Sequence, residues 1–182
     1  LSYAHRKMVE LEINNVKLIQ MDILELDLLE ENYDIIECGG VLHHMDKPKV
    51  GLKALLGVLK KDGFLKLGLY SELGRKDIVK AREYIITKNL QSNVKDIKDF
   101  REDVLSGKIE QISNIRNWLD FYTMSECRDL CFHVIEHRFT IEKLQDTLIF
   151  NQLKFLGFQL PQKIKSLYNN YFPEEKKQTN LE

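Results

Sequence analysis

The stretch at residues 33–44, which reads YDIIECGGVLHH, constrains the fold of this chain more than any other. Its tyrosine and two isoleucines predict a β-strand over residues 33–38, and the pair Gly39–Gly40 ends that pattern. Open α/β sheets bind ligands at the carboxyl ends of their strands, and glycines let the backbone approach a ligand closely. We therefore expect a ligand crevice where this strand ends, although an ordinary turn is the simpler interpretation of the glycine pair.

The flanking segments alternate between helical and strand patterns. The predicted elements are a helix over 2–12, a strand over 16–21, a short helix or turn over 23–31, a helix over 48–60 that starts at Pro48 and stops at Asp62–Gly63, and a strand over 64–70. This alternation predicts an α/β fold with a parallel sheet and crossover helices.

Beyond residue 72 the pattern becomes mainly helical. The predicted elements are helices over 73–89, 94–105 and 108–122, a helix to residue 131 capped by Ser125, an extended segment over 133–139, a helix over 141–150 capped by Thr140, a strand over 153–160 and a weak helix over 162–171. Trp118, Phe121 and Tyr122 are interpreted as core, with a substrate lid as the alternative.

Charge and cysteine usage narrow the functional classes. The 182 residues carry 27 basic and 28 acidic side chains, so the chain lacks the basic excess typical of nucleic-acid-binding proteins. No apolar run approaches 18 residues, so we expect no membrane span. The three cysteines form no disulfide framework, which favours reduced thiols and a cytoplasmic location.

Three successive segments carry a resemblance to a known family. VKLIQMDIL, YDIIECGGVLHHMDKP and LLGVLKKDGFLKLGLY together resemble class I S-adenosylmethionine-dependent methyltransferases, over about residues 1–72. The later FYTMSECRDLCFHVIEHRFTIEKL and LKFLGFQL resemble a bacterial branch that is often attached to tetratricopeptide repeats. The resemblance implies a Rossmann-like sheet, S-adenosylmethionine as cofactor, and methyl transfer to a small-molecule or protein acceptor.

The resemblance also implies roles for particular residues. It makes Asp22 the acceptor of the adenine amino group and packs Ile23 on the adenine ring. It places Cys38, Gly39 and Gly40 beside the methionine and ribose of the cofactor and Val41 in the loop under the sulfonium. The candidate catalytic side chains are His43, His44, Tyr70 and His137. The plainer alternatives are that Asp22 is a polar strand end and that the histidine pair caps a helix or faces solvent.

Two features expected of such a methyltransferase do not occur in this sequence. No Gly-rich turn precedes Gly39, and no acid follows a second strand to hold the ribose. Residues 1–160 are therefore predicted to be a partial, N-terminally truncated methyltransferase domain, with 73–131 as a helical insertion or lid after the third visible strand and 161–182 as a C-terminal tail. We expect this form to be inactive and its open sheet edge to be covered in a homo-oligomer. The alternative function is a non-catalytic binding or assembly module that retains the fold.

A cluster of cysteines and histidines near residue 130 invites a metal-binding interpretation. The spacing of Cys127, Cys131, His133 and His137 matches no common zinc pattern, so we expect no metal site. The two thiols are interpreted as small buried groups. Polar residues that follow them could instead meet the methyl acceptor: His133, Glu136, His137 and Arg138.

Overall fold

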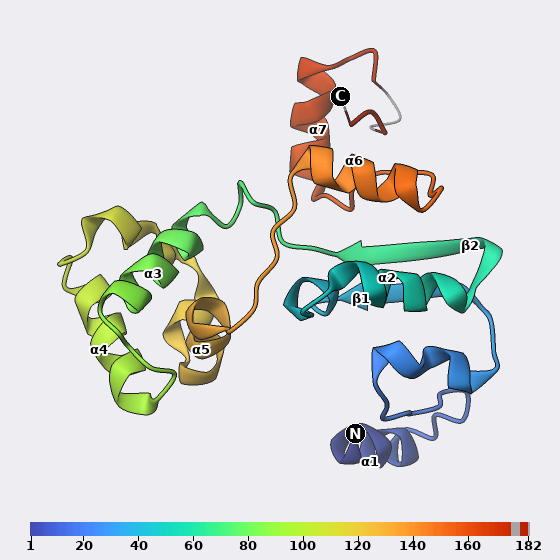
Figure 1. The fold of residues 1–182 in the computed structure, drawn as a ribbon, viewed down its shortest axis with the longest axis horizontal. Helices are drawn as coiled ribbons and strands as arrows, with labels where there is room; N and C mark the ends of the chain where they lie inside the picture. The colour runs from blue at the N-terminus through green and yellow to red at the C-terminus, as the bar shows by residue number, and fades with distance from the viewer. Residues whose placement is uncertain (176–178, 182) are drawn as a thin grey trace. The chain divides into compact units, whose positions relative to one another are not determined.

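The computed structural model describes residues 1–175 and 179–181, and the chain divides into two compact units (Figure 1). The first unit comprises Leu1–Leu69 together with Ile135–His137. The second comprises Tyr70–Val134 and Arg138–Glu182. Part of the predicted tail, residues 176–178 and 182, lies outside the described residues.

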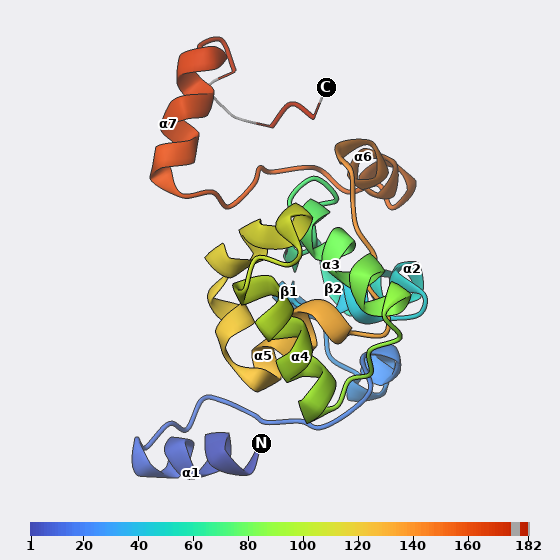
Figure 2. The ribbon, with the colours of Figure 1, turned by 90° about the vertical axis from the view of Figure 1, so that its left-hand side faces the viewer.

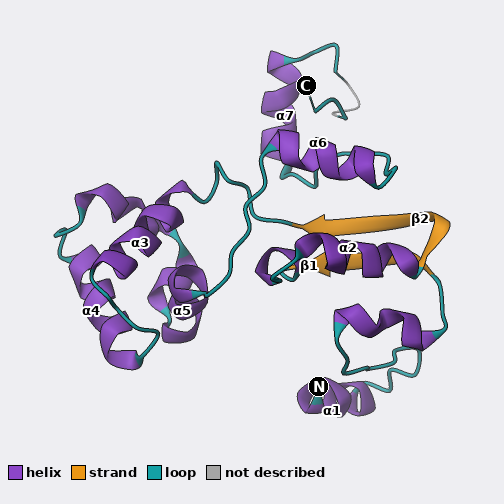
Figure 3. Cartoon of the chain, viewed as in Figure 1, coloured by secondary structure: helices purple, strands orange, loops and turns teal. Residues whose placement is uncertain are grey.

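The first unit contains the only two strands of the described residues, and they pair in parallel (Figure 3). Its elements are α1 (Ser2–Glu10), η1 (Ile23–Leu29, a 3₁₀ helix), β1 (Tyr33–Gly39), η2 (Leu42–His44, a 3₁₀ turn), α2 (Pro48–Gly57) and β2 (Leu59–Gly68). Helix α2 is the crossover between the two strands, and its first residue is Pro48, where a missing N–H costs nothing. The predicted α/β content is confirmed, while a larger Rossmann-like sheet stays a prediction.

The alternation of side chains along β1 and β2 decides which face of this small sheet is buried. Alternate positions turn toward α2 because successive side chains of a strand point to opposite faces. The core of this unit consists of Cys38, Leu42, Leu52 and Leu55, with Ile36, Leu65 and Leu67 packed against it. The opposite face exposes Ile35 and Phe64, which are register partners.

Two sequence predictions in this unit are wrong. Residues 16–21 are not a strand, because a strand needs a neighbour for its ladder and no described segment pairs with them. Helix α2 ends at Gly57 rather than at residue 60, and Lys60 lies in β2. Lys60 Nζ lies 2.8 Å from Asp34 Oδ1, and the N–H of Tyr33 donates to the carbonyl of Val58, so pairing with β1 begins before the predicted helix stop.

The second unit is helical. Its elements are α3 (Lys76–Thr87), α4 (Val94–Leu105), η3 (Glu110–Asn117), η4 (Leu119–Tyr122), α5 (Met124–Phe132), α6 (Ile141–Phe150) and α7 (Gln162–Tyr171). Helices α3, α4 and α5 lie together (Figures 1 and 2), and Phe100 and Phe121 are fully buried among them. Trp118 packs on this core, whereas Tyr122 is about half exposed.

Several boundaries in the second unit differ from the predictions. Residues 108–122 form two 3₁₀ helices instead of one helix. Helix α5 is capped by Thr123, which accepts from the N–H of Glu126 and donates to its carboxylate, so Ser125 is not the cap. The sequence T-x-x-E is typical of a capping box, in which the glutamate accepts from the backbone N–H of the cap residue. Here the Glu126 carboxylate accepts from the Thr123 hydroxyl instead. The predicted cap at Thr140 is confirmed.

Two segments predicted to be extended form little or no sheet. Residues 153–160 are not a strand, because a strand needs a ladder partner and no described segment pairs with them. Residues 133–139 contribute one isolated parallel bridge, between Ser71 and Phe139. No helix in the described part of the chain is long and apolar enough to span a membrane.

Candidate functional site

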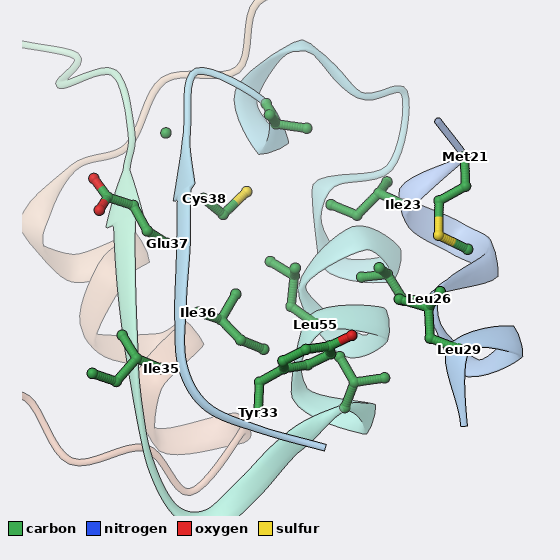
Figure 4. Close-up of a pocket in the computed structure, with 13 residues that line it drawn as sticks. Met21, Ile23, Leu26, Leu29, Tyr33, Ile35, Ile36, Glu37, Cys38 and Leu55 are labelled. Atoms are coloured by element: carbon green, nitrogen blue, oxygen red, sulfur yellow. The ribbon is translucent and has the colours of Figure 1, made fainter. Parts of the chain in front are cut away.

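A hollow of about 640 Å³ opens in the first unit beside β1 (Figure 4). The residues that line it come from η1, β1, α2 and the turns between them: Met21, Ile23, Leu26, Leu29, Tyr33, Ile35, Ile36, Glu37, Cys38, Gly39, Val41, Leu55 and Val58. Its volume lies within the range of about 300–1,000 Å³ that is usual for small-molecule sites, and most of its lining is apolar.

Two sequence segments face each other across this hollow. Figure 4 shows Ile36 and Cys38 extending from β1 toward α2 and η1, with Leu55 between them and η1. Met21 and Ile23 approach from the opposite side, at the start of η1. The strand that ends in the glycine pair and the segment around residue 22 therefore border one space.

Four of the six predicted cofactor-binding residues line the hollow, namely Ile23, Cys38, Gly39 and Val41. The other two, Asp22 and Gly40, adjoin lining residues in sequence. Asp22 caps η1, because its Oδ1 accepts a hydrogen bond of 2.9 Å from the N–H of Leu24. Within the described residues its Oδ2 makes no hydrogen bond, and the side chain is exposed. The structure does not test the roles of these residues, which stay predictions.

Both strands of the sheet end in a glycine, Gly39 in β1 and Gly68 in β2. Gly39 and Gly68 are register partners, and Gly40 has a positive φ of 75°, which favours glycine. A methyl group added at Gly39 would meet no atom within 4 Å, whereas one added at Gly68 would lie 3.0 Å from the Cα of Gly39. The backbone is thus open at Gly39 and closely packed at Gly68, a residue that sequence reasoning did not single out.

Cys38 lines the hollow and is buried. Burial raises the pKa of its thiol above the ordinary value, and a hydrogen bond from the backbone of Leu42 offsets part of that rise. A raised pKa keeps the thiol neutral at neutral pH, so Cys38 contributes an apolar surface and not a nucleophile.

The histidine pair lies on η2, and a distant part of the chain holds it. His44 Nδ1 lies 3.0 Å from the carbonyl oxygen of Ile135, and the N–H of His137 donates to the carbonyl of His43 at 2.8 Å. His43 is only 1% exposed, and its ring packs edge-on against His44 with centroids 4.4 Å apart. The structure therefore brings together three of the four catalytic candidates, His43, His44 and His137, in the first unit.

Tyr70, the fourth candidate, belongs to the second unit. The guanidinium of Arg75 lies 4.0 Å from the centroid of its ring, and Arg75 also donates to the carbonyl of Leu130. Arg75 is buried, and no sequence pattern signalled this role, because a cation–π contact has no spacing rule.

The cysteine pair of α5 is buried in the helical core. A hydrogen bond from the Cys131 thiol lowers the pKa of Cys127, and the same bond together with burial raises the pKa of Cys131. Among the described residues no group of three or more histidine, cysteine, aspartate or glutamate side chains is arranged to hold a metal ion. The two thiols therefore serve as a hydrogen-bonded pair within an apolar core.

Sequence reasoning did not identify four apolar residues as part of the lining of the hollow. Leu26, Leu29, Leu55 and Val58 line it, and each sits at helical spacing from another apolar residue. That spacing predicts burial but does not say whether another side chain or a ligand completes the packing.

Comparisons with known proteins concern the same part of the sequence. A family model described as "Methyltransferase domain" matches residues 1–67, the segment that forms both sides of the hollow. The predicted resemblance to class I S-adenosylmethionine-dependent methyltransferases is thereby confirmed over those residues. An uncharacterised protein of Synechococcus sp. (strain PCC 6301) is 31% identical over 151 residues, which are 76% of this chain and 35% of that protein. The chain thus spans about a third of the length of this relative.

Proposed function

We propose that the methyltransferase-domain segment at residues 1–67 binds S-adenosylmethionine in the hollow, and that the protein transfers the methyl group to a small-molecule or protein acceptor. One observation carries the proposal. The hollow is bordered both by the residues predicted to meet the adenine ring and by those predicted to meet the methionine and ribose.

The residues present fit the chemistry of this cofactor. Met21 and Ile23 offer an apolar surface for a flat adenine ring, and Asp22 offers a carboxylate oxygen to the exocyclic amino group. Gly39 offers open backbone to a polar chain, because a methyl group placed there meets nothing. The bound sulfonium supplies the leaving group, so these residues have only to bind and orient.

Calorimetry tests this proposal. S-adenosylhomocysteine is titrated into this chain and into the complete gene product, together with Gly39→Ala and Gly57→Ala variants of each. Position 57 is the matched control, because a methyl group also meets no atom there and Gly57 lies outside the hollow. We expect heat from the wild type and the Gly57→Ala variant, and affinity weakened at least tenfold by Gly39→Ala. Absence of binding to every form refutes the proposal.

A non-catalytic binding or assembly module is the second candidate. It is favoured by helices α6 and α7, which bury none of their residues and expose large apolar side chains, including Ile149, Phe150 and Tyr171. Apolar surface of this kind is typical of a contact surface. A homo-oligomer that covers the open edge of β1 is compatible with both candidates, and light scattering would detect it.

The three free, buried cysteines suit a reducing compartment such as the cytoplasm.

A further inference from the structure

We propose that His44 is the general base of the methyl transfer, held in the required tautomer by the carbonyl of Ile135, and that the acceptor is a hydroxyl, thiol or ammonium group. This inference rests on the proposed function and deepens it, because it names the class of acceptor. It starts from the contact between η2 and Ile135–His137, a segment distant in sequence that belongs to the same unit.

The hydrogen bond at Nδ1 determines which nitrogen of His44 can act as a base. The carbonyl oxygen of Ile135 can only accept, so Nδ1, 3.0 Å away, carries the proton and donates it. A neutral imidazole with its proton on Nδ1 has its basic lone pair on Nε2. Ile135 thus fixes Nε2 as the atom that takes up a proton.

A second contact keeps the ring in place. The N–H of His137 donates to the carbonyl of His43. Two consecutive residues of the turn, His43 and His44, are therefore each hydrogen-bonded to the distant segment. The turn itself closes through the N–H of His44, which donates to the carbonyl of Val41 at 3.0 Å. Because Val41 lines the hollow, His44 lies one turn from the site that we assign to the methyl donor.

His44 suits this role better than its neighbour. His43 is 1% exposed, whereas His44 is partly exposed and so can meet an acceptor that enters from solvent. Other titratable groups accompany the ring of His44. They are His43, whose ring contacts it, Asp46 just beyond the turn, and Glu136 and His137 on the segment bonded to the turn.

The reaction balances with this assignment. The acceptor atom forms a bond to the methyl carbon of the donor while the bond between that carbon and sulfur breaks and its electron pair goes to sulfur. The acceptor loses its proton to Nε2 of His44, and the imidazolium then releases it to water. A carboxylate acceptor has no proton to lose and needs no base, which is why the proposal excludes that class.

Nuclear magnetic resonance tests the tautomer in this chain without any ligand. Long-range proton–nitrogen spectra of histidine-labelled protein, with His44 assigned from a His44→Asn variant, report which ring nitrogen is protonated. We expect Nδ1 of His44 to carry the proton at a pH where the ring is neutral. A proton on Nε2, or an equal mixture of tautomers, overturns the inference whatever the acceptor is.

Activity tests the acceptor class in the complete gene product. The probes are S-adenosylmethionine with a phenol, a thiol, a primary amine or a carboxylic acid, at pH values from about 5 to 8, where imidazoles titrate. We expect methylation of a protic acceptor at a rate that rises with pH, and a loss of roughly 10²- to 10⁴-fold in His44→Asn. Exposed His5 supplies the matched control, His5→Asn.

The outcomes separate the two proposals. Unchanged affinity of His44→Asn for S-adenosylhomocysteine, with the rate lost, supports the base assignment. Methylation confined to the carboxylic acid, or a rate that His44→Asn leaves unchanged, overturns it while the proposed function stands. Absence of S-adenosylhomocysteine binding to wild type and both variants overturns both.

Discussion

Gly39 and Gly68, the last residues of the two strands, give a sharp prediction, because they are register partners with different surroundings. In Gly68→Ala the new methyl group would lie 3.0 Å from the Cα of Gly39 and 3.6 Å from the N of Gly40. Both are backbone atoms, which cannot rotate aside, so the strands must separate by a few tenths of an ångström. In Gly39→Ala the methyl group meets no atom within 4 Å.

The two substitutions should therefore change stability in opposite directions. Overpacking of this kind costs about 1–3 kcal/mol, so Gly68→Ala should accelerate amide exchange in the β1–β2 ladder by roughly 5- to 150-fold. Gly39→Ala should slow the same exchange by about two- to fivefold, because alanine restricts the unfolded chain and causes no native strain.

Hydrogen exchange of the β1 and β2 amides, followed by nuclear magnetic resonance, makes this measurement within the first unit alone. The amides of the second unit serve as an internal reference, since neither substitution touches its core. Equal effects of the two substitutions, or destabilisation by Gly39→Ala alone, would refute the close packing inferred at Gly68.

Three further predictions concern the helical unit. Phe100→Ala should lower its free energy of unfolding by about 3–5 kcal/mol, because the ring is fully buried, and Trp118 fluorescence should report the loss during urea denaturation. Asp103→Asn should destabilise by up to about 1 kcal/mol above pH ~5. A hydrogen bond from Lys108, then one from Tyr84, lowers the pKa of Asp103, so this difference should vanish as the pH falls through that lowered value; an effect constant with pH would contradict this. Thr123→Ala should cost about 0.5–2 kcal/mol, whereas Ser125→Ala should have no measurable effect.

The stretch at residues 33–44 predicted its own structure well. Its β-branched and aromatic residues formed β1, and the glycine pair ended the strand because Gly40 adopts a backbone conformation that suits glycine. Local chemistry was sufficient there. The start of α2 at Pro48 was predictable for the same reason, since a proline fits the first turn of a helix.

Strand predictions failed where pairing decided the outcome. Residues 16–21 and 153–160 have strand-like composition, but no described segment pairs with either. Conversely, Lys60 was predicted to end a helix and instead pairs with Asp34 across the sheet. A composition rich in β-branched and aromatic residues favours a half-buried pleated surface. A segment with this composition forms a β-strand only when another strand pairs with it.

The candidate site was predictable in its sequence neighbourhoods but not in its geometry. The resemblance named Ile23 and Gly39, and the hollow brings both to one space. The contact of His44 with Ile135 spans 91 positions of the sequence, and no periodicity or motif signals it. Long-range contacts of this kind follow from the folded chain alone.

One measurement tests the central claim most directly. The complete gene product, labelled at its isoleucine methyl groups and backbone amides, is titrated with S-adenosylhomocysteine and followed by nuclear magnetic resonance. The proposal predicts that the Ile23 methyl and the Gly39 amide shift together with one dissociation constant, while the Ile164 methyl on α7 stays unmoved. Binding that shifts neither Ile23 nor Gly39, or only one of them, would contradict a single donor site in the hollow.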